Sequence, residues 1–353
     1  MIKAVIDLHD KIAHFHVMGK IMSALGASKA WPGYDCGLSK EEYENLEAII
    51  HAQKHRNGWF TETEVRRSLA AWGLELKKEK LEGWVSSYDL PIERPRVVGL
   101  IMAGNIPLVG LHDMISVLLA GHSVLAKTSK DDSQLIKVFA QVLITMDERW
   151  KEWIHWVDGP MKGQEAIIAT GSNNTSRYFE HYFSSVPHII RKNRTSVAIL
   201  DGTESEEEMK GLAEDIFAYF GLGCRNVTKL YLSKEFDLDI FFKSIFPYAD
   251  IVQNNKYANN YDYHRSVYLL NGDDLLENGF LLLKEDSSLH SPVSCMFYER
   301  YEDRKSLDRH LEDLKNEIQC IVSKSDTPFG QAQQPRLADY ADGEDTMKFL
   351  RGL

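Results

Sequence analysis

The chain has 353 residues, of which 44% are hydrophobic and 26% charged, which fits a globular protein of about two domains. Its 41 basic and 52 acidic side chains give a formal net charge of −11, which disfavours a nucleic-acid-binding surface or one that binds anionic membranes. The sequence has no apolar run near the roughly 20 residues of a membrane-spanning helix, no signal-peptide pattern and no CxxC pair among its cysteines, so we expect a soluble, cytoplasmic protein with reduced thiols and no metal site.

The first ninety residues have helical patterns. Residues 39–52 open with a serine followed by glutamates, which is typical of a capped helix start. A second amphipathic run, 65–73, follows Thr61. The proline-containing stretch 90–95 then interrupts the pattern, and we predict a boundary there.

From residue 97 onward, strands and helices alternate. Residues 97–102 predict a buried strand, and the turn 103–107 leads into a predicted helix, 108–120, with Pro107 in its first turn and Gly121 just past its end. A strand at 123–127 completes a βαβ unit, which implies parallel strands. Further strands are predicted at 165–170, 196–200 and 228–232. The alternation indicates an α/β fold.

A helix is predicted to open in the acidic run 204–208 and to carry Met209, Leu212, Ile216 and Phe220 on one face. Cys224 follows this helix and precedes the strand at 228–232. Its neighbouring glycines allow close approach of a substrate to backbone N–H groups, and Arg225 favours the thiolate. A small buried side chain is the competing interpretation, because unpaired cysteines are often buried.

Several turns, taken in chain order, resemble those of the aldehyde dehydrogenase superfamily, and within it the LuxC-type fatty acyl-CoA reductases. They are Asn105-Ile106-Pro107, the turn, strand and lysine-containing loop over 120–130, Thr170-Gly171-Ser172, and the cysteine turn 221–224. The resemblance implies an aldehyde-dehydrogenase-like two-domain α/β fold, with a Rossmann-like cofactor domain, an α/β catalytic domain and a helical N-terminal segment. The expected bounds are 1–90 for the helical segment, 91–200 plus 331–353 for the NAD(P)-binding domain, and 201–330 for the catalytic domain.

The resemblance also assigns roles to particular residues. Cys224 would be the nucleophile, and the Asn105 side chain would join the Cys224 amide in the oxyanion hole. The cofactor would contact residues in the loop after one strand and at the start of a helix: Lys127, Ser129, Lys130, Gly171 and Ser172. Considered alone and without the family, each residue is better explained by a structural role, Asn105 as a helix cap and Lys127 as a strand end in solvent.

Three departures from the superfamily's pattern refine this expectation. The stretch 190–194 contains no carboxylate where oxidising members carry a general base, which favours thioester reduction over hydrolysis. Lys130 stands where NAD-preferring members often carry a glutamate, which favours NADPH, with NADH as the alternative. The segment 288–292 lacks the glutamate that orients the nicotinamide ribose, so it receives no role. His112-Asp113 is interpreted as helix packing in preference to a metal or proton-relay site.

We therefore expect an NADPH-dependent acyl-CoA reductase that forms an aldehyde through a thioacyl-Cys224 intermediate and uses no metal. By resemblance we also expect an acyl-protein ligase or acyltransferase partner and a homo-oligomer. Two alternatives stay open: an acyl-phosphate reductase of the same superfamily, and a non-catalytic acyl-binding or scaffold homologue.

Overall fold

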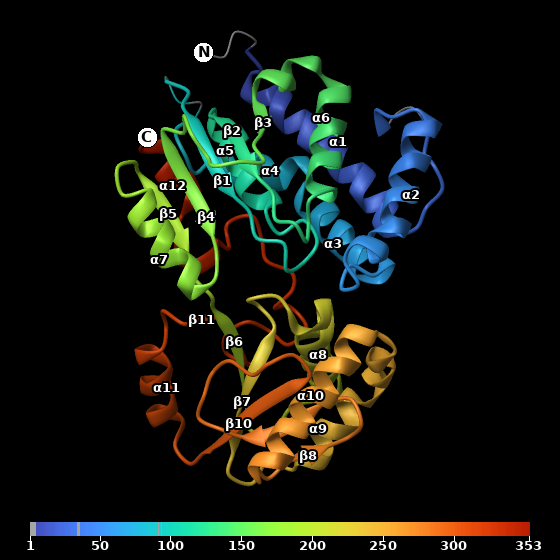
Figure 1. Cartoon of the computed structure of the whole chain (residues 1–353), viewed down its shortest axis with the longest axis vertical. Helices are drawn as coiled ribbons and strands as arrows, with labels where there is room; N and C mark the ends of the chain where they lie inside the picture. The colour runs from blue at the N-terminus through green and yellow to red at the C-terminus, as the bar shows by residue number, and fades with distance from the viewer. Residues whose placement is uncertain (1–4, 34–35, 91, 93) are drawn as a thin grey trace. The chain divides into compact units, whose positions relative to one another are not determined.

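The chain forms two compact α/β units, each built around its own sheet. The computed structural model describes residues 5–33, 36–90, 92 and 94–353. Unit 1 consists of Met1–Lys192 and Arg336–Leu353, and unit 2 of Asn193–Pro335 (Figure 1). In the part of the chain that is described, each helix is too short or too polar to cross a membrane.

Unit 1 combines the N-terminal helices, a five-stranded sheet and the C-terminal helix. Its elements are α1 (Leu8–Gly26), α2 (Lys40–Arg56), α3 (Glu62–Glu75), α4 (Lys78–Val85), β1 (Val97–Ile101), α5 (Leu111–Ala120), β2 (Ser123–Lys127), α6 (Leu135–Met146), β3 (Ile154–Trp156), β4 (Ala166–Thr170), α7 (Asn173–Tyr182), β5 (His188–Arg191) and α12 (Thr346–Arg351). Short 3₁₀ turns occur at Glu148–Glu152 and Ala341–Gly343.

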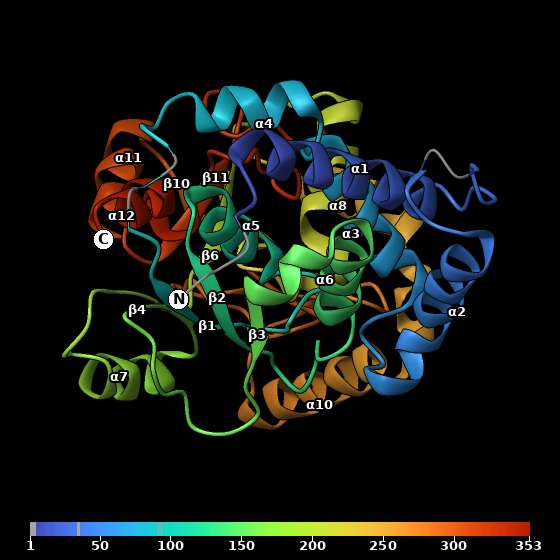
Figure 2. The same ribbon diagram turned by 90° about the horizontal axis from the view of Figure 1, so that it is seen from above.

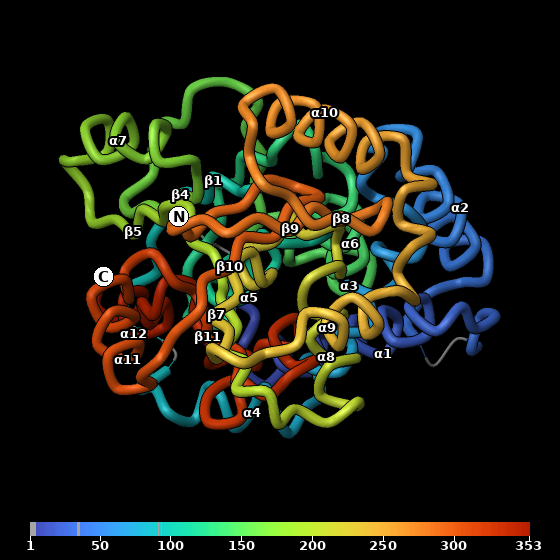
Figure 3. The backbone as a smooth tube through the Cα atoms, turned by 90° about the horizontal axis from the view of Figure 1, so that it is seen from below, coloured from blue at the N-terminus to red at the C-terminus, as the bar shows by residue number. Residues whose placement is uncertain are grey.

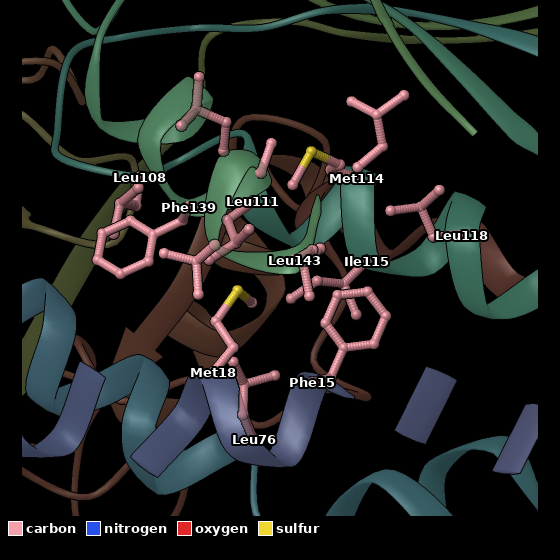
Figure 4. Packing of buried hydrophobic residues seen from close by; sticks show 14 of the residues in the cluster. Phe15, Met18, Leu76, Leu108, Leu111, Met114, Ile115, Leu118, Phe139 and Leu143 are labelled. Carbon is pink, nitrogen blue, oxygen red and sulfur yellow. The ribbon is translucent and has the colours of Figure 1, made fainter. Parts of the chain in front are cut away.

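All five strands of unit 1 are parallel, in the order β3-β2-β1-β4-β5. Because side chains alternate along a strand, each strand supplies both faces. One face, with Leu100, joins the large core that α1, α5 and α6 complete, and Figure 4 shows its centre. The other face, with Ile167, packs with Phe183 just after α7. Helix α12 returns from the end of the chain to lie against α5 (Figure 2).

Several predicted boundaries in unit 1 are confirmed because their signals are local. Ser39 caps α2 in a full capping box with Glu42, and Thr61 caps α3. Gly121 ends α5 in the left-handed conformation, with φ of 103°. Strand β2 has the predicted bounds.

The predicted start of the helix after β1 is wrong. Helix α5 begins at Leu111, with Gly110 as its N-cap, and Leu108 has φ of +60°. Pro107 therefore lies in a turn before the helix, and Asn105 is not the helix cap. Local propensity is overridden here because side chains from distant segments bond to the Pro107 carbonyl and the Leu108 amide.

Unit 2 has a six-stranded sheet in the order β11-β6-β7-β10-β9-β8, parallel except for β8. Figure 3 shows α10 alongside β8 and β9. The elements of unit 2 are β6 (Thr195–Leu200), α8 (Glu206–Phe217), β7 (Val227–Ser233), α9 (Leu238–Ile245), α10 (Asn255–Asn271), β8 (Leu276–Glu277), β9 (Leu282–Glu285), β10 (Cys295–Tyr301), α11 (Arg304–Asp313) and β11 (Ile318–Val322), with 3₁₀ turns at Ala218–Gly221 and Phe246–Gln253.

The acidic run does open α8, where Ser205 and Glu208 form a capping box. Met209, Leu212 and Ile216 are buried from this helix, as predicted. Phe220 is not on its face, which corrects the prediction. The helix ends at Phe217, and Tyr219 and Phe220 have left-handed φ values of 52° and 58°.

Candidate active site

Three of the predicted functional turns meet at one edge of the unit 1 sheet. Strand β1 leads to Asn105, β2 ends at Lys127, and β4 leads to Gly171. In the parallel register, Ile101 at the end of β1 pairs with Lys127 and with Ala169. The carboxyl ends of adjacent parallel strands are the usual ligand-binding edge of an α/β sheet, so the fold brings these turns together where a ligand is expected.

Lys127 is not simply a solvated strand end. Its Nζ donates a hydrogen bond to the Gly159 carbonyl at 3.0 Å, so its ammonium is held at the edge beside β3. Ser129 Oγ accepts from the Asp131 amide at 3.2 Å, which shapes the loop. Lys130 is exposed in that loop. The three side chains thus offer two cations and a hydroxyl at the sheet edge.

Gly171 and Ser172 stand immediately before α7. Ser172 is the N-cap, and its Oγ accepts from the Thr175 amide at 3.3 Å. A Cβ at Gly171 would lie 3.1 Å from side-chain atoms of Thr175 and of Phe179, which is tighter than ordinary contact. The first N–H groups of the helix lack carbonyl partners within the helix and lie at the positive end of its dipole, where an anionic group binds favourably.

Cys224 lies in unit 2, in the turn between Gly221 and β7. Its side chain is exposed, which argues against the interpretation as a small core residue. Ser196 Oγ donates to the Cys224 carbonyl at 3.0 Å. Three successive residues before the turn, Tyr219, Phe220 and Gly221, have positive φ. Such strain is costly for the two non-glycine residues and is commonly found at functional sites.

The buried side chain of Asn226 holds this turn together. Its Oδ1 accepts from the Gly223 amide at 2.8 Å. Its Nδ2 donates to backbone carbonyls at the end of α8 and beyond it, namely Asp215 at 3.0 Å, Ile216 at 3.2 Å and Ala218 at 2.8 Å. One side chain therefore connects the helix end, the left-handed turn and the cysteine turn.

A second brace joins the cysteine turn to the segment 328–333. The Asp215 carboxylate accepts from the Gly330 amide at 2.7 Å and the Ala332 amide at 2.9 Å. Arg225 Nε donates to the Ala332 carbonyl. Burial raises the pKa of Asp215 to about 6, although both amides and Arg225 work against the rise. The Asp215 carboxylate thus fixes the backbone segment whose carbonyl accepts the hydrogen bond from Arg225. Arg225 directly follows Cys224 in the chain.

The stretch without a carboxylate, 190–194, begins in β5. Arg191 is 5% exposed, and its guanidinium donates to Asp113 Oδ2 at 2.6 Å and to Thr346 Oγ1 at 3.0 Å. Burial opposes its charge, but Asp113 keeps the pKa of Arg191 raised. A permanently charged arginine cannot act as a general base, and Asp113 is occupied by the ion pair.

His112 packs against neighbouring helices of unit 1, as predicted, with its side chain partly buried. Its ring lies near the rings of Trp72, Trp84 and Tyr340, and its Nε2 is 2.9 Å from the Leu337 carbonyl. Burial lowers the pKa of His112, so the neutral ring donates to that carbonyl. Among the described residues, no group of three or more histidine, cysteine, aspartate or glutamate side chains is arranged to hold a metal ion.

Sequence reasoning missed Asn226, Asp215 and Arg191. The partners of Asp215 are 115 and 117 residues away, so no local pattern reports them. Asn226 carries a weak signal: a polar residue directly before an apolar strand and two positions after the candidate nucleophile.

Comparison with known proteins relates this geometry to characterised families. Residues 88–241 match the family described as "Acyl-CoA reductase (LuxC)". A long-chain acyl-protein thioester reductase from Aliivibrio fischeri is 26% identical over 274 residues, covering 70% of this chain and 56% of that protein. Long-chain acyl-protein thioester reductase 2 from Photobacterium leiognathi is 25% identical over 160 residues, covering 41% and 33%. The chain therefore matches about half the length or less of these curated relatives.

Solved structures agree on the fold. The HpcC protein from Thermus thermophilus superposes with a TM-score of 0.64 at 11% identity, covering 91% of this chain and 70% of that one. Aldehyde dehydrogenase 21 from Physcomitrella patens, in complex with the reaction product succinate, gives a TM-score of 0.60 at 13% identity, covering 90% and 77%. The predicted aldehyde-dehydrogenase-like α/β fold is thus confirmed.

Proposed function

We propose that the chain is a LuxC-type member of the aldehyde dehydrogenase superfamily and that it reduces an acyl-CoA thioester to the free aldehyde through Cys224. The observation that carries the proposal is the exposed Cys224 on a strained turn that Asn226 and Asp215 brace. A rigid turn with an accessible thiol and nearby backbone N–H groups suits nucleophilic attack on a carbonyl.

The acylation step needs only the chain's own groups. The Cys224 thiolate attacks the acyl carbonyl, and the tetrahedral oxyanion is stabilised by the Cys224 amide and the Asn105 side chain. CoA leaves as its thiolate, and the acyl group remains on sulfur. Arg191 in place of a carboxylate leaves the stretch 190–194 without a base to activate water, so the thioester persists long enough to be reduced.

The residues at the unit 1 sheet edge fit a nicotinamide dinucleotide. The N-terminus of α7 behind Ser172 suits the pyrophosphate, Lys127 and Ser129 suit the ribose hydroxyls, and Lys130 suits a 2′-phosphate. We therefore propose NADPH over NADH. When bound, the reduced nicotinamide supplies a hydride for the thioacyl carbon. The resulting hemithioacetal anion then collapses, which regenerates the Cys224 thiolate and releases the aldehyde.

The same proposal includes the partners expected by resemblance, an acyl-protein ligase or acyltransferase and a second copy of the chain. The names of the curated relatives specify acyl-protein thioesters. A protein-bound acyl group therefore belongs in any test of the donor, beside acyl-CoA.

The decisive experiment separates acylation from reduction. The purified protein is incubated with acyl-CoAs of several chain lengths, an acyl-protein thioester and an acyl phosphate, without cofactor, and its intact mass is measured. We expect an acyl adduct with acyl-CoA, absent in Cys224→Ala, that is discharged as aldehyde faster by NADPH than by NADH. Acylation only by the acyl phosphate would indicate the acyl-phosphate reductase, and no adduct with any donor would favour the non-catalytic scaffold.

A further inference from the structure

Two buried side chains form hydrogen bonds to the two ends of one peptide group, which lies two residues after Asn105. Ser68 Oγ, on α3, donates to the Pro107 carbonyl at 2.8 Å. Asp132 Oδ2 accepts from the Leu108 amide at 2.7 Å. The carbonyl and the amide belong to the single peptide bond between Pro107 and Leu108, so its plane is fixed from both sides. Ser68 is 4% exposed and Asp132 5%, which excludes competition from solvent.

The Pro107–Leu108 peptide would relieve backbone strain by rotating if these two hydrogen bonds were lost. Leu108 has φ of +60°, a region that is unfavourable for a residue with a Cβ. Turning the peptide plane over would return φ of Leu108 to negative values without moving its side chain. That side chain is fully buried and lies beside Phe139 in the core, as Figure 4 shows. The two hydrogen bonds therefore hold the backbone in an orientation that the residue itself disfavours.

The two hydrogen bonds made by Ser68 and Asp132, called the clamp below, also connect the Asn105 turn to the cofactor loop and to the N-terminal helices. Asp132 lies two residues after Lys130, and a Cβ at Gly104 would come within 2.6 Å of Ser129 Cβ, so the two segments touch directly. Helix α2 holds the same loop, because Gln53 Nε2 donates to Gln134 Oε1 at 2.9 Å. Ser68 and Gln53 precede residue 88, where the match to the reductase family begins.

Asp132 is a carboxylate buried in the core, which is an uncommon position for this residue type. Its Oδ1 is buried and lacks a hydrogen-bond partner among the described residues. Burial raises the pKa of Asp132 to about 6, although the backbone amides of Leu108 and Leu135 work against the rise. A carboxylate with one oxygen lacking a close partner is costly at a core position, even though the two amides offset part of that cost. The observed contact of Asp132 with the strained peptide offers a functional reason for keeping it.

We propose that Ser68 and Asp132 are positioning residues that lock the Pro107–Leu108 peptide and thereby hold Asn105 in place to stabilise the oxyanion. This inference rests on the proposed function, since it assumes that Asn105 serves Cys224 acylation. It assigns the N-terminal helices a part in catalysis through Ser68. A displacement of about 1 Å at a reacting group costs about 100-fold in rate, which sets the expected scale.

The test compares two reactions of the same thiol. Acylation of Cys224 by acyl-CoA passes through an oxyanion, whereas alkylation by iodoacetamide does not. We expect Asp132→Ala to slow acylation by about 10- to 100-fold and to leave alkylation within about twofold of wild type. Ser68→Ala, which removes one hydrogen bond, should slow acylation by about fivefold. Asp131→Ala is the matched control, because that carboxylate is exposed in the same loop and should have no effect.

A double mutant distinguishes positioning from general loosening. If Asp132 acts through Asn105, then Asn105→Ala/Asp132→Ala should acylate no more slowly than Asn105→Ala alone. If the effects of the two substitutions on the acylation rate multiply, the proposal is wrong. It is also wrong if the wild type is acylated and Asp132→Ala is acylated at the normal rate. If Asp132→Ala does not fold, Ser68→Ala decides the matter by the same comparison. A wild type that is alkylated but never acylated would overturn the proposed function itself.

Discussion

Asn226 uses both polar atoms of its side chain on backbone groups. It is completely buried. Its Oδ1 accepts from one amide, and the two hydrogens of its Nδ2 are shared among three backbone carbonyls in the interior of unit 2. Leaving a buried polar group without a partner costs roughly 1–3 kcal/mol, so a single side chain here affects several such groups at once. The cysteine turn is thus ordered by a residue that takes no part in the chemistry.

Replacing Asn226 with alanine should therefore loosen the cysteine turn and the end of α8. We expect a loss of about 3 kcal/mol in the free energy of unfolding, together with slower acylation of Cys224. Hydrogen exchange followed by mass spectrometry locates the effect, because peptides that span 218–227 should exchange faster. Asn271→Ala is the control, since that asparagine is exposed at the end of α10. Unchanged exchange in the 218–227 peptides would show that the turn holds without Asn226.

At the residue scale, the sequence predicted the side chains proposed for chemistry but not the side chains that hold them in position. Cys224 and Asn105 stand in short motifs that a reader can recognise. Asp132 and Ser68 do not, because their partners, at 24 and 39 residues' separation, become neighbours only in the folded unit. Motifs record what touches the substrate, whereas supporting contacts depend on the fold.

At the scale of elements, local signals predicted several helix ends and the strands β1, β2, β4, β6 and β7. The two wrong boundaries, the start of α5 and the end of α8, adjoin the two turns proposed for catalysis. In both places non-glycine residues have positive φ and a side chain from outside the helix bonds to the backbone. Tertiary contacts override helical propensity there, which is expected where strain serves a function. The outer strands β3 and β5 escaped prediction because they have only three and four residues.

A buried lysine on helix α1 forms a hydrogen bond to helix α5. Lys11 is 2% exposed, its Nζ donates to the Leu118 carbonyl at 2.8 Å, and it lies 3.7 Å from the centroid of the Trp153 ring. Burial lowers the pKa of Lys11 to about 7, although Asp7 works against the fall. Because the folded pKa lies below the usual 10.5, the folded state binds fewer protons than the unfolded state between about pH 7 and 10.5.

The stability of unit 1 should therefore contain a term from Lys11 that is fully present above pH 10.5 and is lost as the pH falls through 7. Relative to Lys11→Met, the wild type should gain roughly 1 kcal/mol per pH unit between about pH 7.5 and 9.5. Urea unfolding followed by tryptophan fluorescence measures this. Lys20→Met, at an exposed position of the same helix, should show no such dependence. A constant difference between wild type and Lys11→Met across that range would mean that Lys11 stays charged.

At the scale of the whole molecule, the residues proposed for function divide between the two compact units. Asn105, Lys127 and Ser172 belong to unit 1, and Cys224 belongs to unit 2. The sequence order of the motifs predicted an aldehyde-dehydrogenase-like fold, which the structural neighbours confirm. The assignment of one domain to cofactor binding and the other to catalysis stays a prediction, and so do the roles of the individual residues.

Helix α12, formed by residues near the end of the chain, packs into the core of unit 1. Met347 and Leu350 of α12 are fully buried in the core that α5 shares, and His122 Nε2 is 2.9 Å from the Leu350 carbonyl. Since His122 Nδ1 accepts from the Arg96 amide at 3.0 Å, Nε2 carries the proton and donates to that carbonyl. The C-terminal segment is therefore part of the unit that contains the proposed cofactor edge.

Truncating Leu350 to alanine should destabilise unit 1 by about 3 kcal/mol, because a buried leucine side chain leaves both a transfer loss and a cavity. All seven tryptophans of the chain lie before residue 193, so their fluorescence reports on unit 1 alone. Lys348→Ala, two positions earlier on the exposed side of α12, should change stability by less than about 0.5 kcal/mol. If the two variants unfolded at the same urea concentration, α12 would contribute nothing to the core, and the C-terminal segment would need another explanation for its burial. The expected gap between them would instead show that the stability of unit 1 depends on the return of the chain to it.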